Sequence, residues 1–474
     1  MLRKQVSDNA ATYPDPLKGI NLRAADEDLM PLEARLMQNT YFDGGIRVRL
    51  GSRRITATAL DATKRIRGGH KFYYGGSSPA NKRLVAYGTK ISTVNDTGTE
   101  AVLTSGMTSD LDTYFTTWSI TDKVYINNGT DTLRSYDGTT FATVAGTNIP
   151  VPRGYTVPVS DRLLAITTNG IERCNPRDPT IWSSNSSWAT LRPSLVGLFT
   201  TLHPVSVRGT DSIYTGALAF QPNAWYLITG TNFGSDVTAG TASAGEDASI
   251  RLMSNAIGSS SPYGVASVPG LGVFWFTTDL NVALLPEGQL AASYVGDRLV
   301  SKCSIAGIEE TNKAALGQVV MTYFDRKLWL GVPTGTNTYP SRWFWLDVRA
   351  MQTQPDLGPV WYGPHTGFTA GRLWAENQQS DFLLMGGEGN ASTGAYLYRY
   401  EVPGVTTDAI GTTDTTIAPI YQTYFKAYGN PSRQKRIQGI HFDMNEFSGS
   451  ATCDLLDLDG TLETGLAITA VPEE

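Results

Sequence analysis

Residues 123–138 read KVYINNGTDTLRSYDG, and this stretch holds the pattern that decides the fold. Two short apolar runs are each followed by a turn pair, Asn-Gly at 128–129 and Asp-Gly at 137–138. Both pairs accept the positive φ that a tight hairpin needs, so each run is expected to be a short strand. The stretch therefore predicts antiparallel strands joined by tight turns.

The same alternation of short strands and glycine turns continues along most of the chain. It recurs irregularly, at roughly 40–60 residues, which is in the range of β-propeller blades. We therefore expect an all-β fold, a β-propeller over residues 51–410 with about seven irregular blades and six or eight as alternatives. Further strand candidates lie at 46–49, 84–88, 161–168, 217–229, 273–277, 319–332, 342–348, 382–385, 396–400, 423–425 and 438–443.

The two ends of the sequence lack the repeated pattern of strands and turns of this central part. Residues 1–50 are predicted to be an N-terminal arm with one short helix, because Leu29, Leu32 and Leu36 recur at helical spacing and Pro31 suits a first turn. The helix is expected to end near Asn39. Residues 411–474 are predicted to be extra strands that close the fold.

Composition agrees with many strands and turns. The 474 residues include 48 glycines and 24 prolines, and only 17% are charged. Coiled coils and long helical bundles need stretches with few chain breakers, so both are disfavoured. The 41% hydrophobic content is enough to build a core, which argues against bulk disorder.

The net charge of −6 conceals an uneven distribution of charges. Residues 1–100 carry a net charge of +6 and the remainder carries −12. The excess peaks between positions 47 and 71, where the basic residues face a single acid, Asp61. Such a run is either a solvated strand face or a surface for phosphate groups, DNA or a partner. The basic residues are Arg47, Arg49, Arg53, Arg54, Lys64, Arg65, Arg67 and Lys71.

Metal, cofactor and catalytic motifs are not found in the sequence. Cys174, Cys303 and Cys453 lack metal-ligand spacing, and the four histidines stand apart from one another. The acidic string at 454–460 lacks the ligands of a calcium loop and is better read as a hairpin turn at Asp459-Gly460. We therefore expect no cofactor, no metal and no enzyme activity.

Two carboxylate pairs and two aromatic clusters leave alternatives open. Glu172 with Asp178, or Asp279 with Glu287, would serve a glycan-cleaving propeller if they faced one another across a sugar bond. The clusters at 274–276 and 343–345 are expected either to pack between blades or to form an oligomer contact. The start of the chain lacks the apolar region of a secretory signal, and no stretch approaches 18 apolar residues. Folding in a cytoplasm without a membrane span is expected.

The order of several motifs resembles the β-propeller tail hub or nozzle proteins of short-tailed phages, also called packaged-DNA stabilisation or tail tubular B proteins. The first motif is PLEARLMQN at 31–39 leading into FDGGIRVRLGSRR at 42–54. The second is IGSSSPYGV at 257–265, followed by GVFWF at 272–276. The third is YFDRKLWL at 323–330, and the last comprises 420–425, 435–437 and 440–443.

This resemblance implies a virion structural protein, synthesised and assembled in the host cytoplasm. Members of that family form homohexameric rings that close the DNA-filled head and pass double-stranded DNA during ejection. The implied partners are other copies of the chain, adaptor or portal ring proteins, tail fibres or spikes, and DNA in transit. The alternative is a glycan-binding or glycan-cleaving propeller.

Overall fold

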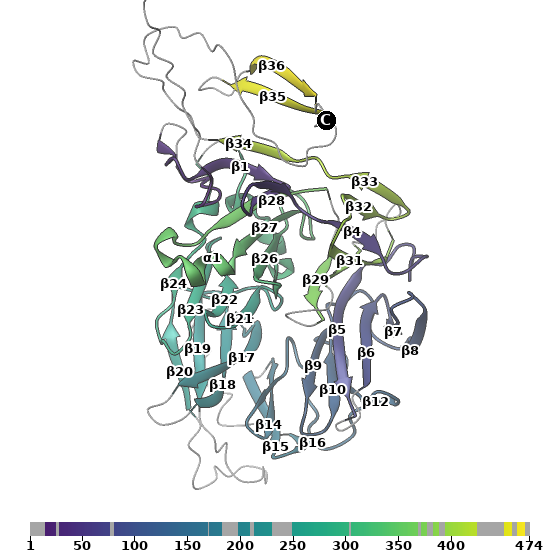
Figure 1. The fold of residues 1–474 in the computed structure, drawn as a ribbon. Helices are drawn as coiled ribbons and strands as arrows, with labels where there is room; N and C mark the ends of the chain where they lie inside the picture. Colours follow the sequence, from purple (N-terminus) through teal and green to yellow (C-terminus); the bar gives the residue numbers. More distant parts are fainter. Residues whose placement is uncertain are drawn as a thin grey trace, which may run out of the picture.

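The computed structural model describes residues 15–24, 28–75, 80–168, 170–182, 198–208, 213–229, 249–302, 305–367, 371–376, 383–387, 394–423, 450–456 and 462–469. Within these ranges nearly all regular structure is β-strand, and seven of the sheets are four-stranded. Each of the seven is antiparallel and is one blade of a propeller. The expected β-propeller is therefore confirmed (Figure 1).

The blades are numbered here in chain order, and each is given from its innermost to its outermost strand. Blade 1 comprises β5 (Ile66–Tyr74), β6 (Ala80–Tyr87), β7 (Lys90–Val94) and β8 (Glu100–Thr104), and blade 2 comprises β9 (Tyr114–Trp118), β10 (Lys123–Asn127), β11 (Arg134–Tyr136) and β12 (Phe141–Thr143). Blade 3 comprises β13 (Val157–Val159), β14 (Arg162–Thr167), β15 (Gly170–Asn175) and β16 (Asp178–Trp182). Blade 4 comprises β17 (Thr201–Arg208), β18 (Ile213–Gln221), β19 (Ala224–Thr229) and β20 (Ser249–Ser254). Blade 5 comprises β21 (Val265–Val268), β22 (Gly272–Phe276), β23 (Val282–Pro286) and β24 (Ser293–Tyr294). Blade 6 comprises β25 (Val320–Phe324), β26 (Lys327–Val332), β27 (Arg342–Asp347) and β28 (Trp361–His365). Blade 7 comprises β29 (Arg372–Ala375), β30 (Leu383–Gly386), β31 (Leu397–Val402) and β4 (Gly51–Arg54).

The innermost strands of neighbouring blades lie side by side and form a closed ring. Contacts between β5 and β9, β13 and β17, β17 and β21, β21 and β25, and β25 and β29 follow the chain order, and β29 returns to β5. Between blades 2 and 3, the hydroxyl of Thr116 in β9 donates to the carbonyl of Thr156 just before β13. The ring is closed by the chain's beginning, because β4 completes the last blade by pairing with β31. An N-terminal strand in the last blade joins the two ends of the ring through backbone hydrogen bonds.

The hydrophobic core is divided among the interfaces between blades. In β10, Val124 and Ile126 pack with residues of blade 1, whereas Tyr125 between them packs with residues of blade 3. In β22, Phe274 packs with blade 6 and Trp275 packs with blade 4. Successive strand residues point to opposite faces, so a strand covered on both faces needs a continuous apolar run. This requirement explains the uninterrupted hydrophobic stretches of the sequence.

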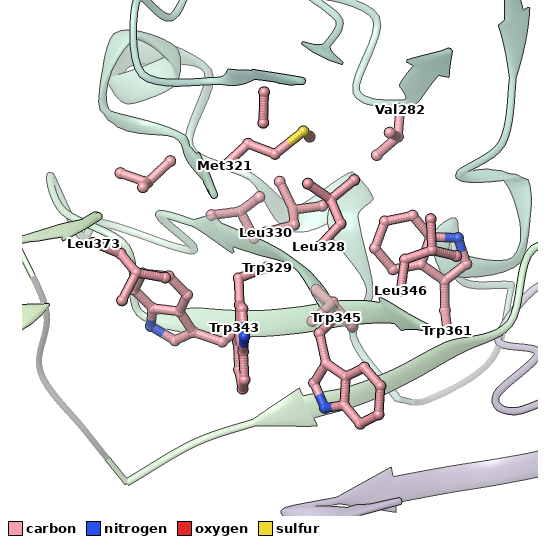
Figure 2. Packing of buried hydrophobic residues seen from close by; sticks show 14 of the residues in the cluster. Val282, Met321, Leu328, Trp329, Leu330, Trp343, Trp345, Leu346, Trp361 and Leu373 are labelled. Atoms are coloured by element: carbon pink, nitrogen blue, oxygen red, sulfur yellow. The ribbon is translucent and has the colours of Figure 1, made fainter. Parts of the chain in front are cut away.

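The two aromatic clusters pack between blades, which was the first of the two expected roles. All residues at 274–276 and 343–345 are buried within the single chain. Figure 2 shows Leu330 of β26 on the face opposite to Trp345 of β27, so that blade 6 packs against neighbours on both sides. Neither cluster is available on the surface for an oligomer contact.

Segments from the two ends of the sequence meet outside the blades. β1 (Ala34–Gln38) pairs with β34 (Ile420–Thr423), and β2 (Thr40–Phe42) forms a hairpin with β3 (Ile46–Val48). β1 and β2 pack against β28, the outermost strand of blade 6. Figure 1 shows β1 and β34 running together at one end of the molecule. We call β1, β2, β3 and β34 the terminal module.

The helix expected near residues 29–39 is wrong, because this segment forms β1. The burial of Glu33, Ala34 and Arg35 is continuous rather than helical. A helix of this length is marginal by itself, whereas β34 supplies hydrogen-bond partners to the backbone along one edge of β1. That partner lies nearly four hundred residues away in the chain, so the local pattern contains no sign of it.

The remaining elements are short and peripheral. They are β32 (Thr407–Ile410) paired with β33 (Thr413–Thr416), β35 (Ser450–Leu456) paired with β36 (Leu462–Thr469), the helix α1 (Val348–Thr353), and the 3₁₀ turns η3 (Asp297–Leu299), η4 (Ile308–Glu310), η5 (Lys313–Gln318) and η6 (Pro355–Leu357). The β35–β36 pair flanks the expected hairpin turn, whose residues 457–461 lie outside the described ranges, as do 424–449 with their predicted closing strands. Over the part of the chain that is described, no helix is long and apolar enough to cross a membrane.

Candidate functional site: the sealed mouth of the central channel

The centre of the propeller holds a cavity to which all seven innermost regions contribute. Its volume is about 480 Å³, and its wall includes aromatic side chains from several blades. These are Phe115, Tyr155, Tyr263, Tyr323 and Trp374. Of the residues that line the cavity, Pro204 within β17 is exposed to solvent.

One end of the cavity, where the innermost strands begin, is closed by tyrosines. Tyr263, just before β21, extends its hydroxyl to within 2.8 Å of the Arg67 carbonyl and 2.6 Å of the Thr113 carbonyl. These carbonyls belong to blade 1 and to the segment before blade 2, so the contact crosses the channel. The rings of Tyr114 and Tyr155 lie 5.1 and 5.7 Å from that of Tyr263. Tyr263, Tyr114 and Tyr155 thus close this end of the cavity, and we call the closed end the sealed mouth.

Arg372, at the start of β29, ties this seal to three other blades. Its side chain is only 2% exposed and lies 2.5 Å from the Asp112 carboxylate. It also donates to Gln318 Oε1 at 2.9 Å, and its guanidinium lies 4.1 Å from the centre of the Tyr263 ring. Gln318 in turn donates to Asp112 at 2.7 Å. Arg372, Asp112, Gln318 and Tyr263 therefore form one connected network.

The protonation states of this network are fixed over the physiological pH range. Burial opposes the charge on Arg372, but Asp112 and Tyr263 outweigh it and raise the arginine's pKa. Burial likewise opposes the charge on Asp112, but Arg372 and the Gln318 hydrogen bond hold its pKa below the ordinary value. Burial raises the pKa of Tyr263 far above its ordinary value. The network can hold a charged ligand, but it contains no group poised to exchange a proton.

Side-chain hydrogen bonds also join neighbouring innermost strands along the channel wall. His70 Nε2 lies 2.7 Å from Thr117 Oγ1, and His203 Nε2 lies 2.7 Å from Ser267 Oγ. Burial lowers the pKa of each histidine to about 4. Both imidazoles are therefore neutral at pH 7 and act as links between blades 1 and 2 and between blades 4 and 5.

Of the eight basic residues expected to form a patch, the structure brings only some together. Arg65 and Arg67 lie beside Arg372 at the sealed mouth, and Lys64 pairs nearby with Asp110 at 2.5 Å. Lys71 pairs with Glu376 at 3.2 Å and is nearly buried. These four residues all belong to blade 1 or to the segment before it.

The other four basic residues lie elsewhere, so the run is not one surface. Arg53 and Arg54 on β4 line a separate surface groove of about 550 Å³. Arg47 is exposed on β3. Arg49 is buried and bonded to Asp408, which corrects its expected role on a partner-facing surface. Alternation along an extended strand turns neighbouring arginines in different directions, and the fold then separates them.

Sequence reasoning missed Arg372, Asp112, Gln318 and Tyr263. They come from four different parts of the ring, and no spacing in the sequence connects them. The only local signal is indirect, because each stands at or just before the start of a strand. Their grouping depends on the closed ring, which places the starts of all innermost strands around one opening.

Three of the four carboxylates considered for glycan cleavage, Glu172, Asp178 and Asp279, have local hydrogen-bond partners. Glu172 accepts a hydrogen bond from Thr167 within blade 3, and Asp178 binds the backbone N–H of Thr180 in a turn. Asp279 accepts a hydrogen bond from Tyr294. Searching the described residues alone, no three His, Cys, Asp or Glu side chains gather as a metal site.

Comparisons with known proteins add little to this geometry. No family model matches the chain, and no curated protein matches it. Among solved structures, one similar chain is described as "YCF48 bound to D1 peptide". It has a TM-score of 0.41 and 10% sequence identity, covering 77% of this chain and 97% of that chain.

Proposed function

We propose that this chain is a structural protein of a short-tailed phage tail. It assembles with other copies, as a homohexameric hub or nozzle ring, closes the DNA-filled head and passes DNA during ejection. Adaptor or portal proteins would bind on one side of this ring, and tail fibres or spikes would attach to it. The proposal places the chain in the virion and assigns it no catalytic residues.

The observation that carries this proposal is the terminal module. The first and last motifs of the resemblance, at 31–54 and 420–425, supply its described strands. β3 is exposed along its whole length, with Ile46 47% and Val48 43% exposed on the same side of the strand. Among the described strands β3 pairs only with β2, so its other edge has no neighbour. Exposed apolar residues beside a free edge suit a contact with another subunit.

The central cavity of the propeller has a limited role in this proposal. Tyr263 and its neighbours close one end of it, so a single propeller offers no open passage. DNA would therefore pass through the centre of the ring of subunits. An overall acidic protein suits such a conduit, because it holds few phosphate groups while the duplex slides.

The test is the assembly state of the full chain. Light scattering after size exclusion and negative-stain microscopy should show a six-fold ring, alone or on an adaptor ring. The double substitution Ile46→Lys with Val48→Lys should leave a folded monomer, because two buried charges would oppose the contact. Val102→Lys is the matched control, since Val102 is 50% exposed on β8, away from the terminal module.

The result decides the proposal in either direction. A ring that forms in the wild type and in Val102→Lys, but not in the double variant, supports it. A wild-type chain that remains a monomer with and without an adaptor ring overturns it. A ring that persists in the double variant removes β3 from the contact and leaves the proposal without its supporting observation.

A glycan-binding or glycan-cleaving propeller is the second candidate, and the open part of the cavity favours it. Tyr323 and Trp374 can stack on sugar rings, and Thr116, His203 and Ser267 line the same space with polar atoms. A glycan array followed by a sugar-release assay tests this candidate. Binding that Trp374→Ala abolishes, in a protein that is monomeric, would replace the tail role.

A further inference from the structure

The sealed mouth carries more positive charge than its acidic residues compensate. Arg67 Nη1 and Arg372 Nη2 share one oxygen of Asp112, at 3.4 and 2.5 Å. Lys64 is paired with Asp110. Within the described part of the chain, no carboxylate lies at ion-pair distance from Arg65, which donates only to neutral oxygens. Two carboxylates, Asp110 and Asp112, therefore face the charges of Lys64 and of three arginines.

The same three arginines have too few hydrogen-bond acceptors. Arg65 donates to the Thr338 carbonyl at 3.2 Å and to Gln318 Oε1 at 3.4 Å, and that amide oxygen also serves Arg372. Each guanidinium carries five N–H donors in a planar fork. The Nε atoms of Arg67 and Arg372 are buried without a hydrogen-bond partner. The contacts of Arg65 and Arg67 are long, so these two side chains have donors to spare.

The arginines are also close enough to oppose one another. Burial is the main cause that lowers the pKa of Arg65 to about 10, and the charges of Arg67 and Arg372 lower it further. Arg65 is half-buried and the Arg67 side chain is 16% exposed, so both remain reachable from solvent. Arg372 is more deeply buried than either of them. An anion at this point would relieve the repulsion and accept the unused donors.

We propose that Arg65 and Arg67, backed by Arg372, bind a phosphate group at the sealed mouth. Arginine forks match phosphate oxygens in bidentate pairs, and a phosphate offers enough oxygens for two forks at once. Asp112 does not compete for the donors that remain, because Arg67 and Arg372 occupy its Oδ1 and Gln318 occupies its Oδ2. The phosphate is either free or a phosphodiester of DNA.

This site is independent of the proposed tail role. It rests on blades 1, 6 and 7 and on the segment before blade 2, whereas the assembly proposal rests on the terminal module. Failure to bind phosphate would leave ring formation untouched. Failure to form a ring would leave phosphate binding untouched.

The experiment is calorimetric titration of the full chain with inorganic phosphate and, separately, with a short DNA duplex. Chloride keeps the ionic strength constant. Arg65→Gln should weaken binding roughly tenfold or more, since it removes a charged pair of hydrogen bonds. Arg65→Lys keeps the charge without the fork and should bind less well than wild type but better than Arg65→Gln. The matched control is Arg53→Gln, because Arg53 is exposed on β4 away from the mouth.

The two ligands separate the sources of the phosphate group. Saturable binding of inorganic phosphate that depends on Arg65 but not on Arg53 supports a site for free phosphate. The same dependence seen only with the duplex supports a site for the DNA backbone. Binding of neither ligand, or equal weakening by Arg65→Gln and Arg53→Gln, overturns the proposal.

Discussion

Arg49 donates to the carboxylate of Asp408 across 359 positions of sequence, and both side chains are almost completely buried. Arg49 also donates to Asn39 Oδ1 at 2.9 Å and to the Thr366 carbonyl at 2.9 Å. The pair thus fastens the terminal module to blade 6 and to the β32–β33 hairpin.

Removal of Asp408 should destabilise the whole protein. Asp408→Ala leaves the Arg49 guanidinium buried without its counter-charge, which costs about 3–5 kcal/mol of unfolding free energy in comparable pairs. Urea unfolding followed by tryptophan fluorescence measures the loss. The double variant Arg49→Met with Asp408→Leu should recover most of it, because neither charge is then buried.

An exposed pair serves as the control for that measurement. Arg23 and Asp297 lie 3.0 Å apart, but both side chains are more than half exposed. Exposed pairs contribute little because water and salt screen them. Arg23→Ala should therefore leave the urea midpoint close to that of the wild type, and a loss as large as that of Asp408→Ala would contradict the assigned role of burial.

Stability should fall as the pH is lowered from about 6.5 towards 4 because of His70 and His203. Burial lowers both pKa values from 6.5 to about 4, so the unfolded chain binds protons in this window and the folded chain does not. The stability that depends on neutral imidazoles is complete above pH 6.5 and is lost on acidification. The loss is roughly 1.4 kcal/mol per histidine for each pH unit inside the window.

Unfolding curves at a series of pH values check this slope. The variant His70→Gln with His203→Gln should show a shallower slope between pH 6.5 and 4. Some slope should remain, because burial together with Arg49 and Lys327 also lowers the pKa of His365. An unchanged slope in the double variant would show that the two imidazoles are exposed to protons in the folded state.

Addition of a methyl group at Gly69 should disturb the closure of the ring. A Cβ at this position would lie only 2.1 Å from the Trp374 ring, where β5 of blade 1 meets β29 of blade 7. Forcing extra volume into a packed interface costs about 1–3 kcal/mol. Gly69→Ala should lower the melting temperature, whereas Gly45→Ala should not, because no atom lies within 4 Å of its Cβ position.

Loss of the Tyr263 hydroxyl should loosen the sealed mouth. Tyr263→Phe keeps the ring stacking but removes the contact with the Arg67 and Thr113 carbonyls. We expect a loss of about 1–2 kcal/mol in unfolding free energy and faster hydrogen exchange at the starts of β5 and β9. Tyr294→Phe is the control, since its hydroxyl bonds to Asp279 on the surface. Equal effects of the two substitutions would argue against the seal.

Much of the fold could be predicted from short stretches of sequence. Gly129 and Gly138 both have the expected positive φ, and Asp137-Gly138 lies in a tight turn between β11 and β12. Asn128-Gly129 instead begins a longer connection, residues 128–133, between β10 and β11. Continuous apolar runs such as 274–276 became strands that are buried on both faces. These signals are local, because a turn pair and a run of apolar residues are both recognised from adjacent positions in the sequence.

The residues of the candidate site could be predicted only in part from short stretches of sequence. The excess of arginine and lysine before and within β5 pointed to Arg65 and Arg67, but it pointed equally to Arg49, which is buried. Arg372 and Asp112 carried no local signal. Which basic residues share a surface depends on strand direction and on the position of each blade in the ring.

The sequence by itself determined that this chain builds many short strands with two apolar faces, and that such strands stack as propeller blades. The tertiary structure alone decided that the segment near residue 36 is a strand, that β4 completes the last blade, and that Arg65, Arg67 and Arg372 meet at one mouth. The physical reason is the separation along the chain over which each kind of interaction acts. Turns and strand patterns act over a few residues, whereas closing a ring brings together groups hundreds of residues apart, and their charges and hydrogen bonds interact only after it has closed.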